Sequence, residues 1–185
     1  HCTSHALSGW DSYPNANNPN TIASSSYNWV VPNSPTEASS NEHSRVPAGP
    51  IGVTLNGLPF FNPYTSSSAD RVSTEILDDC NGTVDGLGLY HYYNEPKCAY
   101  VDVSGEHSPI VGYAFDGYPI YGPRDESGVK ISSSSLDQFH GHSQDGRGYH
   151  YHVTDEAPYV LGAYYKGIPH TGENFMGHSG VNTAP

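Results

Sequence analysis

One segment of the chain occurs twice, and this repetition limits the folds that the sequence can adopt. Residues 56–63 read NGLPFFNP, and about sixty residues later residues 116–123 read DGYPIYGP. Two more pairs of segments match at nearly the same spacing: residues 77–82 with 136–141, and residues 85–93 with 145–152. Solenoid repeats stack in larger numbers, so a unit present only twice is typical of one domain with two related halves.

We therefore expect a single domain whose halves are degenerate repeats of about 60 residues, related by an approximate two-fold axis. The residues before the repeats are rich in Asn, Ser and Pro, which favour turns and predict an extended arm. The expected parts are an N-terminal arm over residues 1–50, copy 1 over 51–110, copy 2 over 111–165 and a C-terminal tail over 166–185.

The local signals in each copy favour strands. The Asn-Gly and Asp-Gly pairs of the repeated segment are typical of hairpin turns, and the aromatic alternation over residues 89–93 and 149–153 is typical of strands. Residues 71–77 predict a short helix capped by Asp70, and the serines over 132–135 could cap its counterpart. The expected fold class is mainly β, with short helices and long ordered loops.

Composition and charge exclude several classes of protein. Fifteen Tyr and two Trp can build a core despite the low aliphatic content. A net charge of −12 excludes a surface that binds nucleic acid or an anionic membrane. The longest apolar stretch, around residues 109–115, is far shorter than the roughly 20 residues of a membrane-spanning helix. The chain opens without a basic, apolar leader, so we expect any secretory signal to be absent or already removed, and His1 could be a mature terminus or an accident of processing.

Cysteines and a sequon indicate an extracellular, secreted protein. Cys80 and Cys98 flank a turn-rich segment that a disulfide could close, although two buried free thiols would also fit. Asn81 begins an Asn-Gly-Thr glycosylation sequon. Cys2 is left over, either as a reactive thiol or as half of an intermolecular disulfide in a homo-oligomer.

Four histidines in copy 2 predict a metal site: His140, His142, His150 and His152. Alternate residues of a strand share a face, so His150 and His152 point to one side and the intervening tyrosines to the other. Imidazoles that converge in this way suit a bound metal ion. The alternative is that the rings only hydrogen-bond to backbone carbonyls across the turn.

Other residues extend this predicted site. His107 is the best additional ligand, and His91 is the one histidine that copy 1 keeps at the aligned positions. Glu106, Asp137 and Asp145 lie near the histidines in sequence and could orient them or act as a base. His1 could bind copper through its α-amine and imidazole together with a second histidine.

Copper is the expected metal and zinc the alternative. Imidazole binds both ions, no thiolate accompanies the cluster, and the general order of affinities favours Cu²⁺ over Zn²⁺. Since a ligating imidazole must be neutral, an ordinary histidine pKa predicts that affinity declines as the pH falls through roughly 6.

The segment from Gly57 to about residue 165 resembles the YHYH-domain family. The resemblance rests on five motifs: residues 57–59, 77–82, 105–109, 116–123 and 148–152, the last of which reads GYHYH. It implies an extracellular setting and no particular reaction. Copy 1 departs from the family pattern, because Tyr93 and residues 81–83 stand where histidines are expected.

Three functions compete at this point. The leading hypothesis is an extracellular metal-binding protein for metal capture or redox chemistry. The alternative is a structural or adhesive glycoprotein that self-assembles through its acidic, Tyr-rich and Ser-rich exterior and Cys2. The third is a copper oxidase that uses His1.

Overall fold

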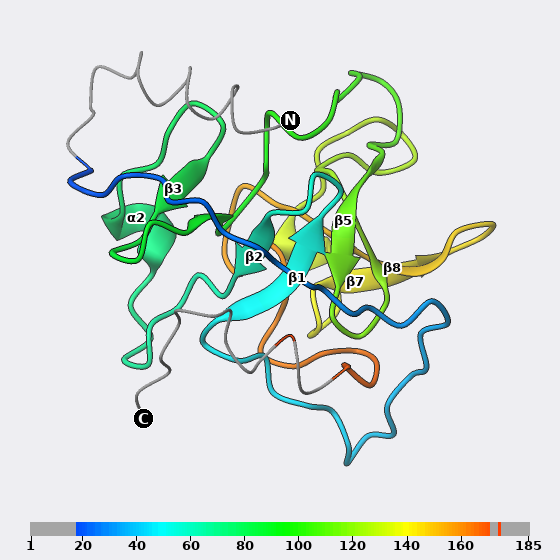
Figure 1. Cartoon of the computed structure of the whole chain (residues 1–185). Helices are drawn as coiled ribbons and strands as arrows, with labels where there is room; N and C mark the ends of the chain where they lie inside the picture. The colour runs from blue at the N-terminus through cyan, green and yellow to red at the C-terminus, as the bar shows by residue number, and fades with distance from the viewer. Residues whose placement is uncertain (1–17, 171–173, 175–185) are drawn as a thin grey trace.

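A computed structural model describes residues 18–170 and Asn174, and Figure 1 shows them arranged around one sheet. These residues form eight strands: β1 (Pro50–Thr54), β2 (Pro59–Phe61), β3 (Gly82–Val84), β4 (Tyr90–Tyr92), β5 (Ile110–Ala114), β6 (Pro119–Tyr121), β7 (Gly141–Gln144) and β8 (Gly148–His152). Their order across the sheet is β3-β4-β2-β1-β5-β6-β8-β7. The predicted mainly-β fold class is confirmed.

The sheet divides at its centre into two halves with the same strand pairing. We call β1 to β4 the first half and β5 to β8 the second half. In each half the first two strands form an antiparallel hairpin, the second strand pairs in parallel with the fourth, and the fourth pairs antiparallel with the third. β1 and β5 pair antiparallel and join the halves. The predicted boundaries of the copies stay predictions.

The two hairpins turn at the Asn-Gly and Asp-Gly pairs. Gly57 and Gly117 have φ angles of 86° and 91°, a left-handed conformation that is unfavourable for residues with a Cβ atom. In the first hairpin the backbone N–H of Thr54 donates to the carbonyl of Leu58 at 2.8 Å and closes the turn. These turns fix the register of the strands that follow.

Tyrosine supplies much of the core, as the composition predicts. Tyr90, Tyr151 and Tyr165 are almost fully buried. The hydroxyls of Tyr90 and Tyr151 each donate to a carboxylate at 2.6 Å, on Asp78 and Asp116 respectively. A buried phenol that keeps a hydrogen bond contributes the burial of its ring without leaving a polar atom unpaired.

The helical elements are shorter than predicted. The helix expected over residues 71–77 is the single turn α2 (Arg71–Thr74), and its counterpart is the 3-10 turn η1 (Ser133–Ser135). Asp70 and Ser132 cap them through side-chain oxygens. No side chain of α2 is fully buried, and within α2 only the partly buried Val72 packs against the core, so apolar packing gives little support to a longer helix. None of the helices in the described ranges is long and apolar enough to cross a membrane.

The described part of the N-terminal arm runs across the sheet and forms no named strand before β1 (Figure 1). Trp29 packs on Phe115 with ring centroids 5.4 Å apart, and its Nε1 donates to the carbonyl of Gly57 at 3.0 Å. The arm therefore contacts the first hairpin and the residue that follows β5.

Candidate metal centre

A group of histidines lies where β8, β6 and the loop before β5 come together. His150 and His152 alternate along β8 and share one face of that strand. β8 pairs in parallel with β6, in a register that places Tyr121 beside His152. His107 comes from the loop that leads into β5, and its ring centroid is 4.9 Å from that of Tyr121. Three segments that are distant in sequence thus meet at one place.

His107, His150 and His152 could hold a metal ion. Each offers one ring nitrogen, and these three atoms lie within 4.8 Å of one another. The ring centroids are 5.7 Å apart for His107 and His150, 5.2 Å for His107 and His152, and 5.0 Å for His150 and His152. Rings this close need only small movements to bring their nitrogens to the roughly 2.0 Å of a metal bond.

Backbone carbonyls select which nitrogen of each ring faces the shared space. The Nδ1 atoms lie within hydrogen-bond distance of three carbonyl oxygens: His107 with Ser108 (2.7 Å), His150 with Gly148 (2.9 Å) and His152 with Gly122 (2.6 Å). A neutral ring that donates through Nδ1 carries its lone pair on Nε2. The three Nε2 atoms are therefore the ones that could bind a metal ion, and the carbonyls orient the rings as outer partners do in known metal sites.

Two buried polar atoms of this group have no partner within the described residues: the Nε2 of His107 and the Nε2 of His152. Each such atom costs about 1–3 kcal/mol when it stays unsatisfied. A bound ion that accepts the imidazole lone pairs would relieve both costs.

His142 lies at the side of the group. It stands opposite His150 in the β7–β8 ladder, and the two Nε2 atoms are 3.0 Å apart. Its ring centroid is 5.1 Å from that of His152. His142 is therefore placed to share a proton with His150 in the metal-free protein and to supply a fourth imidazole.

Burial favours the neutral form of the three rings, which is the form that can bind a metal ion. It lowers the pKa of His150 to about 4 and that of His152 to about 3, while Nδ1 hydrogen bonds to carbonyls act in the opposite direction. Burial also lowers the pKa of His107. At neutral pH no proton has to leave these nitrogens before a metal ion binds.

His140 is not brought to this group. It is buried, its Nε2 lies 2.9 Å from the hydroxyl of Thr154, and its backbone has a φ of 74°. Asp137 has a structural place nearby, because it accepts from the backbone N–H groups of Phe139 and Gly141 and from the hydroxyl of Tyr149. Both residues shape the turn that leads into β7.

His91 lies in the first half, away from the other histidines. Its ring is stacked on Phe61 at 4.2 Å, its Nδ1 is 2.9 Å from the carbonyl of Leu89, and its buried Nε2 has no partner. The residue opposite His91 on the neighbouring strand is Thr83. In the second half the corresponding pair is His150 and His142. No second histidine therefore joins His91 among the described residues of this half.

The remaining predicted residues do not reach the group. Glu106 and Asp145 are exposed, and no contact joins either side chain to the three histidines. His1 and Cys2 lie outside the described residues, so the proposed copper brace and intermolecular disulfide stay predictions.

Two residues at the site were missed by sequence reasoning. The ring of Tyr121 lies 4.7 Å from that of His150, and the guanidinium of Arg147 lies 5.8 Å from the centre of the Tyr121 ring. The parallel pairing of β6 with β8 brings Tyr121 to the histidines. No local sequence pattern predicts such a pairing. Arg147 follows the predicted Asp-Gly turn, which was the available signal for it.

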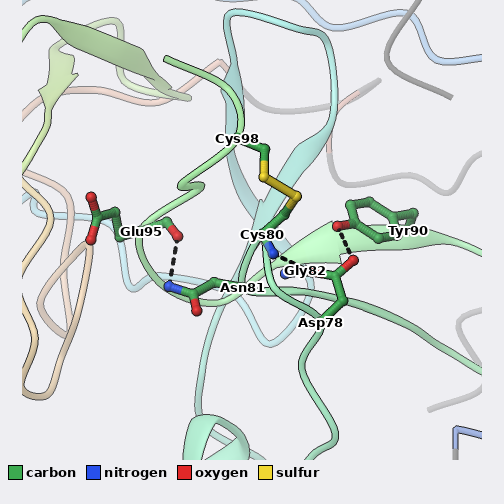
Figure 2. The surroundings of a disulfide bond; sticks show 7 residues. All are labelled: Asp78, Cys80, Asn81, Gly82, Tyr90, Glu95 and Cys98. Carbon is green, nitrogen blue, oxygen red and sulfur yellow. Dashed lines mark hydrogen bonds between the residues drawn. A yellow bond between two sulfur atoms is a disulfide. The ribbon is translucent and has the colours of Figure 1, made fainter. Parts of the chain in front are cut away.

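The predicted disulfide is present in the first half, and Figure 2 shows its surroundings. Cys80 and Cys98 are joined with a Cα–Cα distance of 5.1 Å. Next to the bridge the half-buried Asn81 donates its side-chain N–H to the carbonyl of Glu95 at 3.0 Å. That nitrogen is the one a glycan would modify, so glycosylation would have to accommodate this contact, and it stays a prediction.

Fold and site together define a mainly-β domain with a histidine group that could hold a metal. A comparison with family models then identifies the chain: the model described as YHYH protein matches residues 28–135, which is more than half of the sequence. The protein belongs to the YHYH family, as its motifs predict. The matched span contains His91 and His107 and ends before β7. Searches of curated proteins and of solved structures found no match.

Proposed function

We propose that the protein binds copper through the Nε2 atoms of His107, His150 and His152, with His142 as an adjoining fourth imidazole. The observation that carries the proposal is the convergence of three neutral rings whose Nδ1 atoms are held by backbone carbonyls. The buried Nε2 atoms of His107 and His152, which have no partner within the described residues, support the proposal because one bound ion would accept both lone pairs.

The donor set favours copper over zinc. All the grouped ligands are imidazoles, and no thiolate or carboxylate belongs to the group among the described residues. Cu²⁺ binds nitrogen ligands more tightly than Zn²⁺ does when both are available. Three imidazoles and a more distant fourth suit capture of the ion, and they leave room for an exchangeable ligand that redox chemistry would need.

Titration of metal-free protein with Cu²⁺ and with Zn²⁺ tests the proposal. We expect one tight equivalent of Cu²⁺ with nitrogen hyperfine structure in its EPR spectrum, and weaker binding of Zn²⁺. The His107→Ala protein should lose most of this affinity, and its half-buried position limits the effect on folding. The matched control is His140→Asn, because Asn81 adopts the same left-handed backbone conformation as His140 in the other half. Equal Cu²⁺ affinity in wild type and His107→Ala would refute the ligand assignment.

We also propose that the two halves are degenerate copies of one unit. Several local details recur besides the strand pairing. Asp78 accepts from the hydroxyl of Tyr90 as Asp137 does from that of Tyr149, and His91 repeats the Nδ1 contact that His150 makes with the carbonyl two residues before it. A Cβ on Gly82 or Gly141 would collide with the tyrosine hydroxyl of its own half. Chance recurrence of so many unrelated details is a poor explanation of their agreement.

We infer that the protein works outside the cytosol. A disulfide persists in an oxidising compartment, and the sequon at Asn81 agrees with a secretory route. Mass spectrometry of native protein without reductant should find Cys80 linked to Cys98 and a glycan lost in Asn81→Gln. Native protein with free thiols at both cysteines would contradict this inference.

A further inference from the structure

The charge at the histidine group is unbalanced once a divalent metal ion is bound. Three neutral imidazoles leave its two positive charges uncompensated, and no carboxylate belongs to the group among the described residues. Glu126, whose charge reaches His107, is an exposed side chain. A divalent ion in a partly buried site is more stable when an anion shares the site.

Arg147 adds a further positive charge at this place. Its guanidinium lies over the ring of Tyr121, and that ring in turn contacts His107 and His150. The chain has only 7 Lys and Arg residues and a net charge of −12, so few positions of the protein carry a positive side chain, and one of them lies at this site.

Four of the seven Lys and Arg residues form ion pairs within the described chain, and Arg147, like Arg45 and Lys97, forms none there. Four ion pairs are formed: Arg71 with Glu75, Arg124 with Asp102, Lys130 with Asp155 and Lys166 with Glu37. Arg147 is exposed, and its guanidinium lies 5.8 Å from the centre of the Tyr121 ring. Its five N–H donors are therefore available to a ligand from solution.

We propose that the metal-loaded site takes a small carboxylate monoanion as its exogenous ligand, with one oxygen on the metal and the other on the guanidinium of Arg147. This inference rests on the proposed function, because the metal supplies the first contact. The guanidinium of Arg147 would donate a charge-assisted hydrogen bond to the oxygen that the metal leaves free.

The field of Arg147 agrees with this position. Its positive charge contributes, after burial, to lowering the pKa of both His107 and His150. The cation thus lies near enough to act on two of the three ligands. It opposes metal binding by repulsion when alone, and it would support metal binding when an anion stands between the two charges.

Anion titration of the Cu²⁺-loaded protein tests the proposal. Azide binding is followed by its charge-transfer absorption, and acetate binding by displacement of azide. We compare wild type with Arg147→Gln, Arg147→Lys and the control Lys130→Gln, which removes an equal charge from the Asp155 ion pair. Because one charge-assisted hydrogen bond is lost, we expect acetate affinity to fall about tenfold in Arg147→Gln, less in Arg147→Lys, and not at all in Lys130→Gln.

The outcomes separate this inference from the proposed function. Wild-type protein that holds no metal overturns both. Protein that holds copper, but binds acetate equally well in wild type and Arg147→Gln, overturns only the role of Arg147. Equal losses in Arg147→Gln and Lys130→Gln would also overturn it, because the effect would then come from net charge alone.

Discussion

The two halves of the sheet share a scaffold and differ in what that scaffold carries. In the second half β8 presents His150 and His152, with His142 across the ladder. At the aligned positions of the first half stand His91, Tyr93 and Thr83. Strand pairing and turn geometry are therefore insufficient for a metal site, because the ligating side chains must also be present.

The first half is stabilised in another way. Its Cys80 is joined to Cys98, while the aligned residue of the second half, Phe139, packs its ring 4.5 Å from that of His43. One half therefore uses a covalent link where the other uses apolar packing and a group of imidazoles. This contrast suggests that the two halves have separated into a structural part and a binding part, which the following changes test.

The largest expected effect is on Cu²⁺ affinity, which should depend on His150 and not on His91, its aligned residue in the first half. Four-ligand structural metal sites are worth roughly 10–16 kcal/mol, so loss of one ligand should weaken Cu²⁺ binding about 100- to 1000-fold. We expect this loss in His150→Ala and no loss in His91→Ala, as measured by competition with a chelator of known affinity. Circular dichroism of both proteins shows whether the sheet is intact. Similar affinities for the two variants would remove the distinction between the halves.

The next effect is on stability and concerns the first half. Replacing both bridged cysteines by serine opens a loop with a sequence separation of 18, which should lower the free energy of unfolding by about 3 kcal/mol. Copper affinity should stay unchanged, because the ligands lie in the second half and the loop before it. Denaturant titration and metal titration of the same sample measure the two quantities. A parallel loss of copper affinity would show that the halves are coupled.

The third effect is the pH dependence of the second half. The pKa values of about 4 for His150 and about 3 for His152 mean that protons compete with the metal only at acidic pH. Copper should stay bound at pH 5 and be released as the pH falls through about 4, lower than an ordinary histidine would predict. Release complete by pH 5.5, followed by EPR, would contradict the burial argument.

The same shifts affect folding. A histidine whose pKa is lowered in the folded state stabilises the protein above the unfolded pKa near 6.5, and this contribution is lost as the pH falls toward the folded value. Metal-free protein should therefore lose stability between about pH 6.5 and pH 4 in denaturant titrations. A His150→Gln protein should show a shallower decline over that window.

The smallest expected effect is a gain of binding in the first half. Thr83→His with Tyr93→His would place three imidazoles near one another together with His91. We expect a second, weaker equivalent of Cu²⁺, because Pro47 stands at the position that aligns with His107. The control is the same double variant with His91 replaced by alanine as well. Absence of a second equivalent in a folded protein would show that the halves differ in backbone as well as in side chains.

Local patterns predicted much of the fold. The turns at Gly57 and Gly117, the strands with alternating aromatic residues and the caps at Asp70 and Ser132 all depend on residues within a few positions of one another. The length of α2 was overestimated, because its end depends on how much of the helix is buried: within α2 only Val72 packs against the core. Burial of this kind is a tertiary property.

The candidate site was only partly visible in the sequence. The alternation of His150 and His152 on β8 could be inferred from the two-residue period of a strand. The position of His140 could not be inferred in this way, since its left-handed backbone turns the ring toward Thr154. Tyr121 enters through a parallel strand pairing, which has no local sequence signal.

The sequence by itself determined the twofold pattern of motifs, the β-rich class and family membership, because each is carried by residue identity and short spacing. Only the tertiary structure decided that His107 comes to β8 while His140 does not. The reason is physical: a metal site is a set of atoms within a few ångströms, and distances between remote segments are set by strand order and packing rather than by spacing along the chain.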